Sequence, residues 1–295
     1  MRICAIDVGT NTVVSVVADV ADRQLAVVAD EERFARLGQG VDASGRLAPD
    51  AIDRVLDRLG QAQQTAERLG AEKTVIAATS ASRDAANVGE LVERVRRELG
   101  LEYRVISGVE EAALSFRGAL AMRPALAEAC VVDIGGGSTE VVAGTRAEGV
   151  AFRTSLDVGS VRLTERWVRA YPLSDATQEA IRADVQSALA GVDRQRVGGV
   201  PVVATGSVAT WIAGADERAS LADVADWRAT LAGRTPDEVL ALAPDRMKGR
   251  EDVIAASVLI LEAVLVAFGA EAVLSTRGAL RHGLALQTAE ALARA

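Results

Sequence analysis

The chain has 295 residues, 49% hydrophobic and 25% charged, which is typical of a soluble globular protein of two medium-sized domains. It is acidic, with 41 Asp and Glu against 33 Lys and Arg, so nucleic acid and anionic membranes are not expected partners. The single histidine, His282, excludes a multi-histidine metal centre. Because the longest apolar stretch, 253–268, is too short to span a bilayer and Asp7 comes too early for a signal peptide, we expect a cytoplasmic protein.

The first part of the chain alternates between strand and helix patterns after three opening strands. Strands are expected at 2–6, 13–18, 25–29, 73–78 and 103–106, and helices at 50–69, 88–99 and 108–122. This alternation indicates the α/β class. Pro124 precedes a second set of similar patterns, which places a domain boundary near Arg123.

The second part repeats the plan of the first. Strands are expected at 130–134, 139–143, 150–155, 200–204 and 272–274, and helices at 161–170, 175–190, 252–268 and from about 278, with a broken helical region at 222–242. We therefore predict domains 1–122 and 123–295, with the last helix, about 278–295, free to pack back on the first domain. Cys4 and Cys130 occupy equivalent strand positions, and we expect buried thiols in a reducing compartment.

The most informative feature is an internal repeat at a constant offset of 126 (133 − 7). Residues 3–12 read Ile-Cys-Ala-Ile-Asp-Val-Gly-Thr-Asn-Thr, and residues 129–138 read Ala-Cys-Val-Val-Asp-Ile-Gly-Gly-Gly-Ser. Each copy predicts a strand, a tight polar turn and a second strand. Each turn brings together a carboxylate, backbone N–H groups and hydroxyl or amide side chains, which suit phosphate and a divalent cation.

The two turns supply most of the candidate binding residues. Asp7 and Asp133 end the first strand of each copy and are candidate Mg²⁺ ligands, although each could simply cap its own turn. The three glycines of the second turn allow a bulky anion to approach the backbone, with a glycine-rich hairpin as the alternative. The candidate phosphate-binding residues of the two turns are Thr10, Asn11, Thr12, Gly135, Gly136, Gly137 and Ser138.

A helix start at Ser107 supplies a candidate catalytic carboxylate. Ser107 and Glu110 have the spacing of a capping box, which gives Glu110 a structural role. Glu111 has no such role and could orient and deprotonate an attacking water. The alternative is a solvated glutamate favoured by the dipole of the helix.

Two further segments follow predicted strands. Arg83 follows the strand 73–78 and could neutralise phosphoryl oxygens in a transition state, or pair with Asp84 on the surface. Gly206 and Ser207 begin a helix whose first N–H groups could face an anion, or Ser207 could only cap that helix.

Taken in order, these motifs resemble the exopolyphosphatase and guanosine pentaphosphate phosphohydrolase family, in its short two-domain type. The matching segments are 7–12, 79–83, 106–112, 132–140, 204–207, 250–254 and 278–283. That family belongs to the acetate kinase, sugar kinase, Hsp70 and actin superfamily. The resemblance implies an α/β protein of two ribonuclease-H-like lobes, a duplicated actin-like ATPase fold, with the active site in the cleft between the lobes.

The resemblance also implies roles for individual residues. It assigns Glu111 as the general base, Arg83 as a phosphate contact and Asp133 as a metal-linked aspartate, and it adds Glu140 to the metal site. The chain departs from the family pattern in two places. Val14 stands where many members have an arginine, and Arg277 stands where members often have aspartate and could supply the missing charge.

We expect a hydrolase that releases terminal orthophosphate from inorganic polyphosphate, with short chains preferred and Mg²⁺ as cofactor. The alternative substrate is guanosine pentaphosphate, because the chemistry is the same and no residue identifies guanine. An ATP-dependent kinase and a non-catalytic sensor of polyphosphate or of the nucleotide are further alternatives. The residues Glu111, Arg83 and Asp133 favour a working hydrolase over both. We also expect a homodimer.

Overall fold

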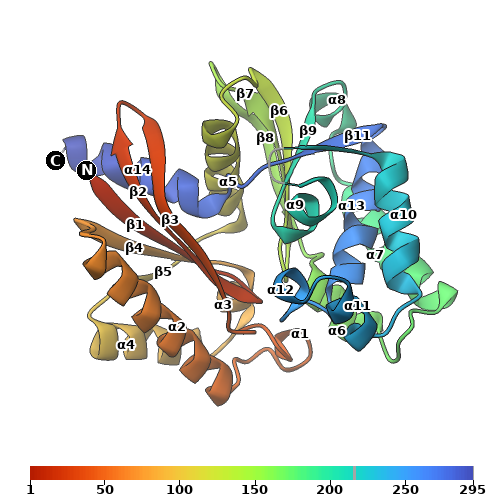
Figure 1. Ribbon diagram of the computed structural model, residues 1–295, viewed down its shortest axis with the longest axis horizontal. Helices are drawn as coiled ribbons and strands as arrows, with labels where there is room; N and C mark the ends of the chain where they lie inside the picture. Colours follow the sequence, from red (N-terminus) through yellow and green to blue (C-terminus); the bar gives the residue numbers. More distant parts are fainter. Residues whose placement is uncertain (215–216, 295) are drawn as a thin grey trace. The chain divides into compact units, whose positions relative to one another are not determined.

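The computed structural model describes residues 1–214 and 217–294. The chain separates into two compact units, Met1–Met122 with Gly278–Ala295, and Arg123–Arg277. Each unit is built on one mixed β-sheet (Figure 1). Among the described helices, none has the length and apolar character needed to cross a bilayer.

The sheet of the first unit has the strand order β3-β2-β1-β4-β5. Its strands are β1 (Arg2–Val8), β2 (Thr12–Ala21), β3 (Gln24–Phe34), β4 (Lys73–Ala78) and β5 (Tyr103–Val105). β1 pairs antiparallel with β2 and parallel with β4, and β4 pairs parallel with β5. The carboxyl ends of β1, β4 and β5 therefore meet at one edge of the sheet, where α/β proteins place ligand groups.

Helices cover both faces of this first sheet. They are α2 (Pro49–Arg68), α4 (Val88–Leu99), α5 (Gly108–Met122) and α14 (Leu280–Arg294), with short helices α1 (Val41–Ser44) and α3 (Ser80–Asp84) in connections. Alternate side chains of β1 point to opposite faces. Cys4 and Ile6 pack in one cluster with α2 and α4, whereas Ile3 and Ala5 pack in another with α14 and Leu114 of α5.

The sheet of the second unit has the order β10-β11-β9-β6-β7-β8. Its strands are β6 (Glu128–Ile134), β7 (Thr139–Thr145), β8 (Gly149–Leu156), β9 (Val202–Thr205), β10 (Arg218–Ser220) and β11 (Ala272–Ser275). β6 pairs antiparallel with β7 and parallel with β9, as β1 does with β2 and β4. The two sheets therefore share their central topology.

The helices of the second unit surround one large core cluster. They are α6 (Ser160–Trp167), α7 (Asp175–Leu189), α8 (Arg194–Val197), α9 (Ser207–Ala213), α10 (Leu221–Ala232), α11 (Pro236–Leu242), α12 (Pro244–Met247) and α13 (Ile254–Phe268). Helix α13 is apolar around most of its circumference and is buried, as its composition predicts. Its one charged residue, Glu262, lies 2.9 Å from a guanidinium nitrogen of Arg228 on α10, so the partly buried charge is paired.

The internal repeat is present in the backbone geometry. Asp7 lies opposite Val14 in the first hairpin, and Asp133 lies opposite Glu140 in the second, at the same register. The turn of each hairpin is closed by one hydrogen bond of 2.9 Å, from Gly9 N–H to the Thr12 carbonyl and from Gly135 N–H to the Ser138 carbonyl. The two turns are therefore closed in the same way.

Most predicted elements are confirmed, but the short helices α1, α3, α8 and α12 were not predicted, and two strands differ from the prediction. The strand predicted at 25–29 continues to Phe34, because its polar half pairs with β2 beyond an irregularity between Val17 and Ala18. A polar sequence is compatible with this strand because β3 is at the edge of the sheet. The short strand β10 was not predicted, since its three residues carry no alternating pattern.

The two cysteines behave as the sequence predicts. Cys4 and Cys130 are both free and fully buried, one in each unit. Burial raises the pKa of the Cys4 thiol to about 11 and that of the Cys130 thiol to about 12. Both therefore remain neutral thiols near pH 7 and act as small core residues.

Candidate active site

In the first unit, Glu111 and Arg83 form a partly buried ion pair. Glu111 lies in the first turn of α5 and is 7% exposed. Arg83 lies in the last turn of α3, and its Nη1 is 2.6 Å from Glu111 Oε2 and 3.1 Å from the carbonyl of Ile106. Because α3 follows β4 and α5 follows β5, both groups lie at the carboxyl edge of the parallel strands.

Neighbouring charges have other partners. Asp84 accepts a hydrogen bond from Ser80 Oγ at 3.2 Å, whereas the Arg83 guanidinium binds Glu111 and the Ile106 carbonyl, so the structure favours the Arg83–Glu111 pair over the alternative of an Arg83–Asp84 surface pair. The predicted cap is half formed: Glu110 N–H donates to Ser107 Oγ at 3.2 Å, while the Glu110 carboxylate binds Arg104 Nη1 at 2.5 Å.

The first turn is held from behind by the segment that follows β3. Backbone N–H groups of Ala35 and Arg36 donate to the Asn11 carbonyl at 3.0 and 2.8 Å, and Gly38 N–H donates to the Thr10 carbonyl at 2.8 Å. In a trans peptide, C=O and N–H point in opposite directions. The N–H groups of Asn11 and Thr12 therefore point away from this segment, as a phosphate-binding turn requires.

Gly38 makes this contact possible. A Cβ at position 38 would lie 2.2 Å from Thr10 Cγ2 and 3.2 Å from the Ala81 side chain, so only glycine fits between the turn and α3. Asp7 is also close to this region. Burial and, to a smaller degree, the Asp7 charge raise the pKa of Tyr103. The Tyr103 hydroxyl lies 2.8 Å from Ser82 Oγ on α3. The structure thus gathers Asp7, the first turn and α3 at one edge.

The second turn is held in the same manner by α6. Ser160 N–H donates to the Gly135 carbonyl at 3.0 Å, and the N–H groups of Val161 and Arg162 donate to the Gly136 carbonyl at 2.8 and 3.0 Å. The first N–H groups of a helix have no partner within it, so the turn satisfies them. By the same peptide geometry, the N–H groups of Gly136 and Gly137 point away from α6.

Asp133 and Glu140 form a pair of carboxylates on adjacent strands. They lie directly opposite each other on β6 and β7, and Glu140 is only 1% exposed. Ser155 Oγ donates to Glu140 at 2.7 Å and Thr205 Oγ1 donates to Asp133 at 3.3 Å. Like charges directly opposite each other on adjacent strands destabilise a sheet, and a cation bound between them would offset this repulsion. The two carboxylates are therefore suited to holding a cation.

Mg²⁺ is commonly held by only one or two carboxylates together with phosphate and water. No cluster of three or more His, Cys, Asp or Glu side chains suited to a metal occurs in residues 1–214 and 217–294. The carboxylate pair therefore matches a site that is completed by a phosphate ligand.

Gly206 brings a third segment to the second turn. It has φ of +87° and ends β9 beside the Ile134 carbonyl, from which a Cβ would be 3.2 Å. Gly206 is the residue that precedes α9, and Ser207 is the first helical residue, so the alternative in which Ser207 caps the helix is wrong. The sequence predicts Gly206 and Ser207 as anion contacts, and their place beside the end of β6 agrees with that role.

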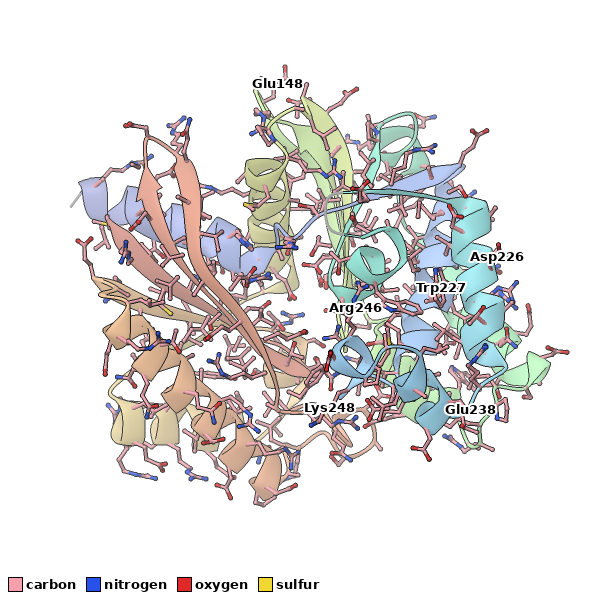
Figure 2. All side chains as sticks on the ribbon, viewed as in Figure 1. Glu148, Asp226, Trp227, Glu238, Arg246 and Lys248 are labelled. Carbon is pink, nitrogen blue, oxygen red and sulfur yellow. The ribbon has the colours of Figure 1, made fainter. Side chains whose placement is uncertain are left out.

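Three glycine or arginine positions at the turns were not predicted: Gly38, Gly159 and Arg162. No local motif distinguishes them, because each acts on a turn that is distant in sequence. A basic cluster lies elsewhere in the second unit, where Figure 2 shows Arg246 and Lys248 at the end of α12. Arg246 Nη2 donates to the carbonyl of Thr210 on α9 at 2.9 Å.

A phosphohydrolase of duplicated α/β architecture is the class that this fold and these residues define. The chain belongs to the Ppx/GppA phosphatase family, whose profile matches residues 16–291. It is 36% identical over 286 residues to exopolyphosphatase 2 of Mycobacterium tuberculosis, covering 88% of this chain and 89% of that protein.

Two other proteins extend the comparison. A guanosine-5'-triphosphate,3'-diphosphate pyrophosphatase of Vibrio cholerae is 36% identical over 162 residues, covering 55% of this chain and 32% of that protein. The crystal structure of an exopolyphosphatase from Cytophaga hutchinsonii superimposes with a TM-score of 0.89 at 24% identity, covering 99% of this chain and 98% of that chain. The likeness confirms the predicted α/β fold with two actin-like lobes.

These findings confirm the predicted family and the predicted class of enzyme, a phosphoanhydride hydrolase. Membership in a phosphatase family also favours hydrolysis over the kinase alternative.

Proposed function

We propose that the chain is an exopolyphosphatase that releases terminal orthophosphate from inorganic polyphosphate by attack of water. The observation that carries the proposal is the Arg83–Glu111 pair, in which a carboxylate 7% exposed lies 2.6 Å from a guanidinium. A general base and a cation for phosphoryl oxygens are the two groups that this reaction requires. The similarity to exopolyphosphatase 2 supports this choice of substrate.

Glu111 accepts the proton of the attacking water, and Arg83 offsets the charge on the phosphoryl oxygens. In the described part of the chain, both hydrogen bonds of the Arg83 guanidinium are made by Nη1. Nε and Nη2 are therefore available to phosphoryl oxygens while Nη1 continues to orient Glu111. A fixed cation in a partly buried site stabilises developing charge more strongly than one in water.

We assign the two turns to binding of the substrate phosphates. Thr10, Asn11 and Thr12 of the first turn, and Gly135 to Ser138 of the second, present N–H groups and hydroxyls, and Gly206 and Ser207 add to the second set. Asp133 and Glu140, opposed on β6 and β7, are the proposed metal ligands of the second unit, and Asp7 is a proposed carboxylate for a cation in the first unit, with Mg²⁺ as the ion. When bound, Mg²⁺ supplies positive charge that neutralises the phosphate oxygens.

Hydrolysis of guanosine pentaphosphate is the second candidate, because the relative from Vibrio cholerae acts on a guanosine phosphate by its name. The deciding experiment is a steady-state comparison of phosphate release from polyphosphates of defined length and from guanosine pentaphosphate. We expect a higher kcat/KM with polyphosphate. A higher value with guanosine pentaphosphate would reverse the assignment.

We further propose that the protein acts in the cytoplasm as a homodimer. The two buried thiols Cys4 and Cys130 are compatible with a reducing compartment. Light scattering coupled to size-exclusion chromatography measures the molar mass directly, and a value near 30.8 kDa would exclude the dimer.

A further inference from the structure

The guanidinium of Arg162 lies directly behind the second turn. Its Nε donates to the Gly137 carbonyl at 2.7 Å, while the backbone N–H of the same residue donates to the Gly136 carbonyl at 3.0 Å. Together with the Ser160 N–H bond to Gly135, three consecutive carbonyls of the turn are bound to the start of α6. The last of the three is held by a side chain that carries a full positive charge.

We propose that Arg162 is a positioning residue for phosphate, which it holds in place through the peptide bond between Gly137 and Ser138. This inference rests on the proposed function, in which the turn 135–138 binds substrate phosphate. Arg162 binds the carbonyl side of that peptide, and the N–H of Ser138 points to the opposite side. The cation therefore fixes the direction of this N–H and polarises it toward an anion.

The packing of the turn against α6 explains why the carbonyl of Gly137 is bound by a side chain and not by a backbone N–H. Gly159, directly before α6, lies so close to the turn that a Cβ would be 2.5 Å from the Gly136 carbonyl oxygen. This contact lets the N–H groups of residues 160–162 reach the carbonyls of Gly135 and Gly136. The carbonyl of Gly137 is reached by the Arg162 side chain instead.

The charge of Arg162 has a consequence that a neutral donor would not have. A trinegative or more highly charged phosphate chain on the N–H side of the turn would interact favourably with a guanidinium on the carbonyl side. Arginine keeps its charge at all physiological pH values. Arg162 thus contributes to phosphate affinity without touching the phosphate.

The test is the affinity of tripolyphosphate for the Glu111→Gln protein, measured by titration calorimetry, so that turnover does not consume the ligand. We expect Arg162→Gln to weaken binding about 10-fold, since the amide retains a donor but not the charge. Arg162→Lys retains the charge and should restore the affinity to within about 3-fold. Arg166→Gln is the matched control on the same helix, because Arg166 pairs with Asp184 at 3.0 Å, and it should bind normally.

A purely structural role predicts a different pattern. In that case Arg162→Gln lowers the midpoint of urea unfolding, but the folded fraction binds tripolyphosphate with unchanged affinity, and the inference is overturned. If Arg162→Gln fails to fold in buffer alone, the same titration is made in a stabilising osmolyte for both the variant and the parent, and equal affinities of the two folded proteins there overturn the inference.

Failure of the inference and failure of the proposed function are distinguished by Ser138→Ala, which alters the turn itself. If Ser138→Ala weakens binding and Arg162→Gln does not, the turn binds phosphate without help from Arg162. If neither change affects binding, the assignment of the turn to phosphate is itself wrong.

Discussion

Arg83 Nη1 lies 2.6 Å from Glu111 Oε2, although the two residues are 28 positions apart and belong to different helices. The pair gives each residue a defined orientation at the edge of the first sheet. A surface arginine or a solvated glutamate would have no such constraint. The family resemblance predicts Glu111 as the general base and Arg83 as a phosphate contact, so the ion pair links a predicted base to a predicted cation.

Replacing Glu111 by glutamine should abolish turnover while the fold and phosphate binding remain. The amide has the shape of the carboxylate but accepts no proton, so we expect kcat to fall by about 10²–10⁴-fold. Phosphate release from tripolyphosphate measures the loss. Glu110→Gln is the matched control, because Glu110 pairs with Arg104 and should lose at most about 1 kcal/mol of stability. If Glu110→Gln were inactive and Glu111→Gln active, Glu110 would be the catalytic carboxylate and our assignment would be wrong.

Arg83→Gln should reduce kcat by about 10²–10³-fold, because the cation for the phosphoryl oxygens and the partner of Glu111 are lost together. Arg104→Gln removes the neighbouring ion pair and serves as control, with kcat expected within about 2-fold of the unaltered protein. Steady-state kinetics at saturating substrate give both values. An equal loss of kcat in the two variants would show that the loss follows from removing any positive charge near the site and not from the position of Arg83.

The sequence predicts the central sheets well because their strands have strong patterns. The helices 88–99 and 108–122 and the strand 73–78 have the bounds that the apolar spacing indicates. The internal repeat predicts that the two hairpins are equivalent, and their shared register confirms it. The polar half of β3 and the three residues of β10 were missed, since neither carries apolar alternation and both are stabilised by pairing with distant strands.

The candidate site also contains residues whose roles the sequence alone does not predict. A motif identifies residues that are close in sequence, such as 135–138, but not the residues that orient them from behind. Gly38 and Arg162 act on turns 28 and 25 residues away, from Thr10 and Gly137 respectively, and their importance depends on tertiary packing alone. The opposition of Asp133 and Glu140 on adjacent strands is partly predictable from the sequence, because the register of a tight hairpin follows from its turn.

Gly118→Ala should destabilise the first unit by about 1–3 kcal/mol. A Cβ on this residue of α5 would lie 2.0 Å from the carbonyl oxygen of Ala279, which directly precedes α14, so the two helices would have to separate. Gly89→Ala is the control: it lies in α4 with open space around it and should stabilise by about 0.5–1 kcal/mol through helix propensity. Urea unfolding measures both. A neutral Gly118→Ala would mean that the crossing is looser than the structure shows.

Stability should fall in acid because of His282. Burial, with a further contribution from the Arg281 charge, lowers the pKa of this fully buried imidazole from 6.5 to about 3. Between these values the unfolded chain binds the proton and the folded chain does not, so stability is complete above pH 6.5 and decreases below it by up to about 1.4 kcal/mol per pH unit. Urea unfolding from pH 7 to pH 5 should show this slope, and His282→Gln should lack it. Identical slopes would mean that His282 titrates normally in the folded state.

The preferred substrate should be a short polyphosphate. The chain has a formal net charge of −8, so a long polyanion gains affinity only where local cations meet it. The exposed residues Arg246 and Lys248 form one such cluster (Figure 2). Arg246 donates a hydrogen bond to the carbonyl of Thr210 on α9, the helix that begins at Ser207. We expect kcat/KM to level off after a few added phosphates, with partly shortened chains accumulating because the enzyme releases its substrate between cuts. Lys248→Gln should raise KM for longer chains about 3-fold and leave tripolyphosphate unaffected. Assays with chains of defined length decide the matter, and a kcat/KM that climbs steadily through very long chains without intermediates would refute the prediction.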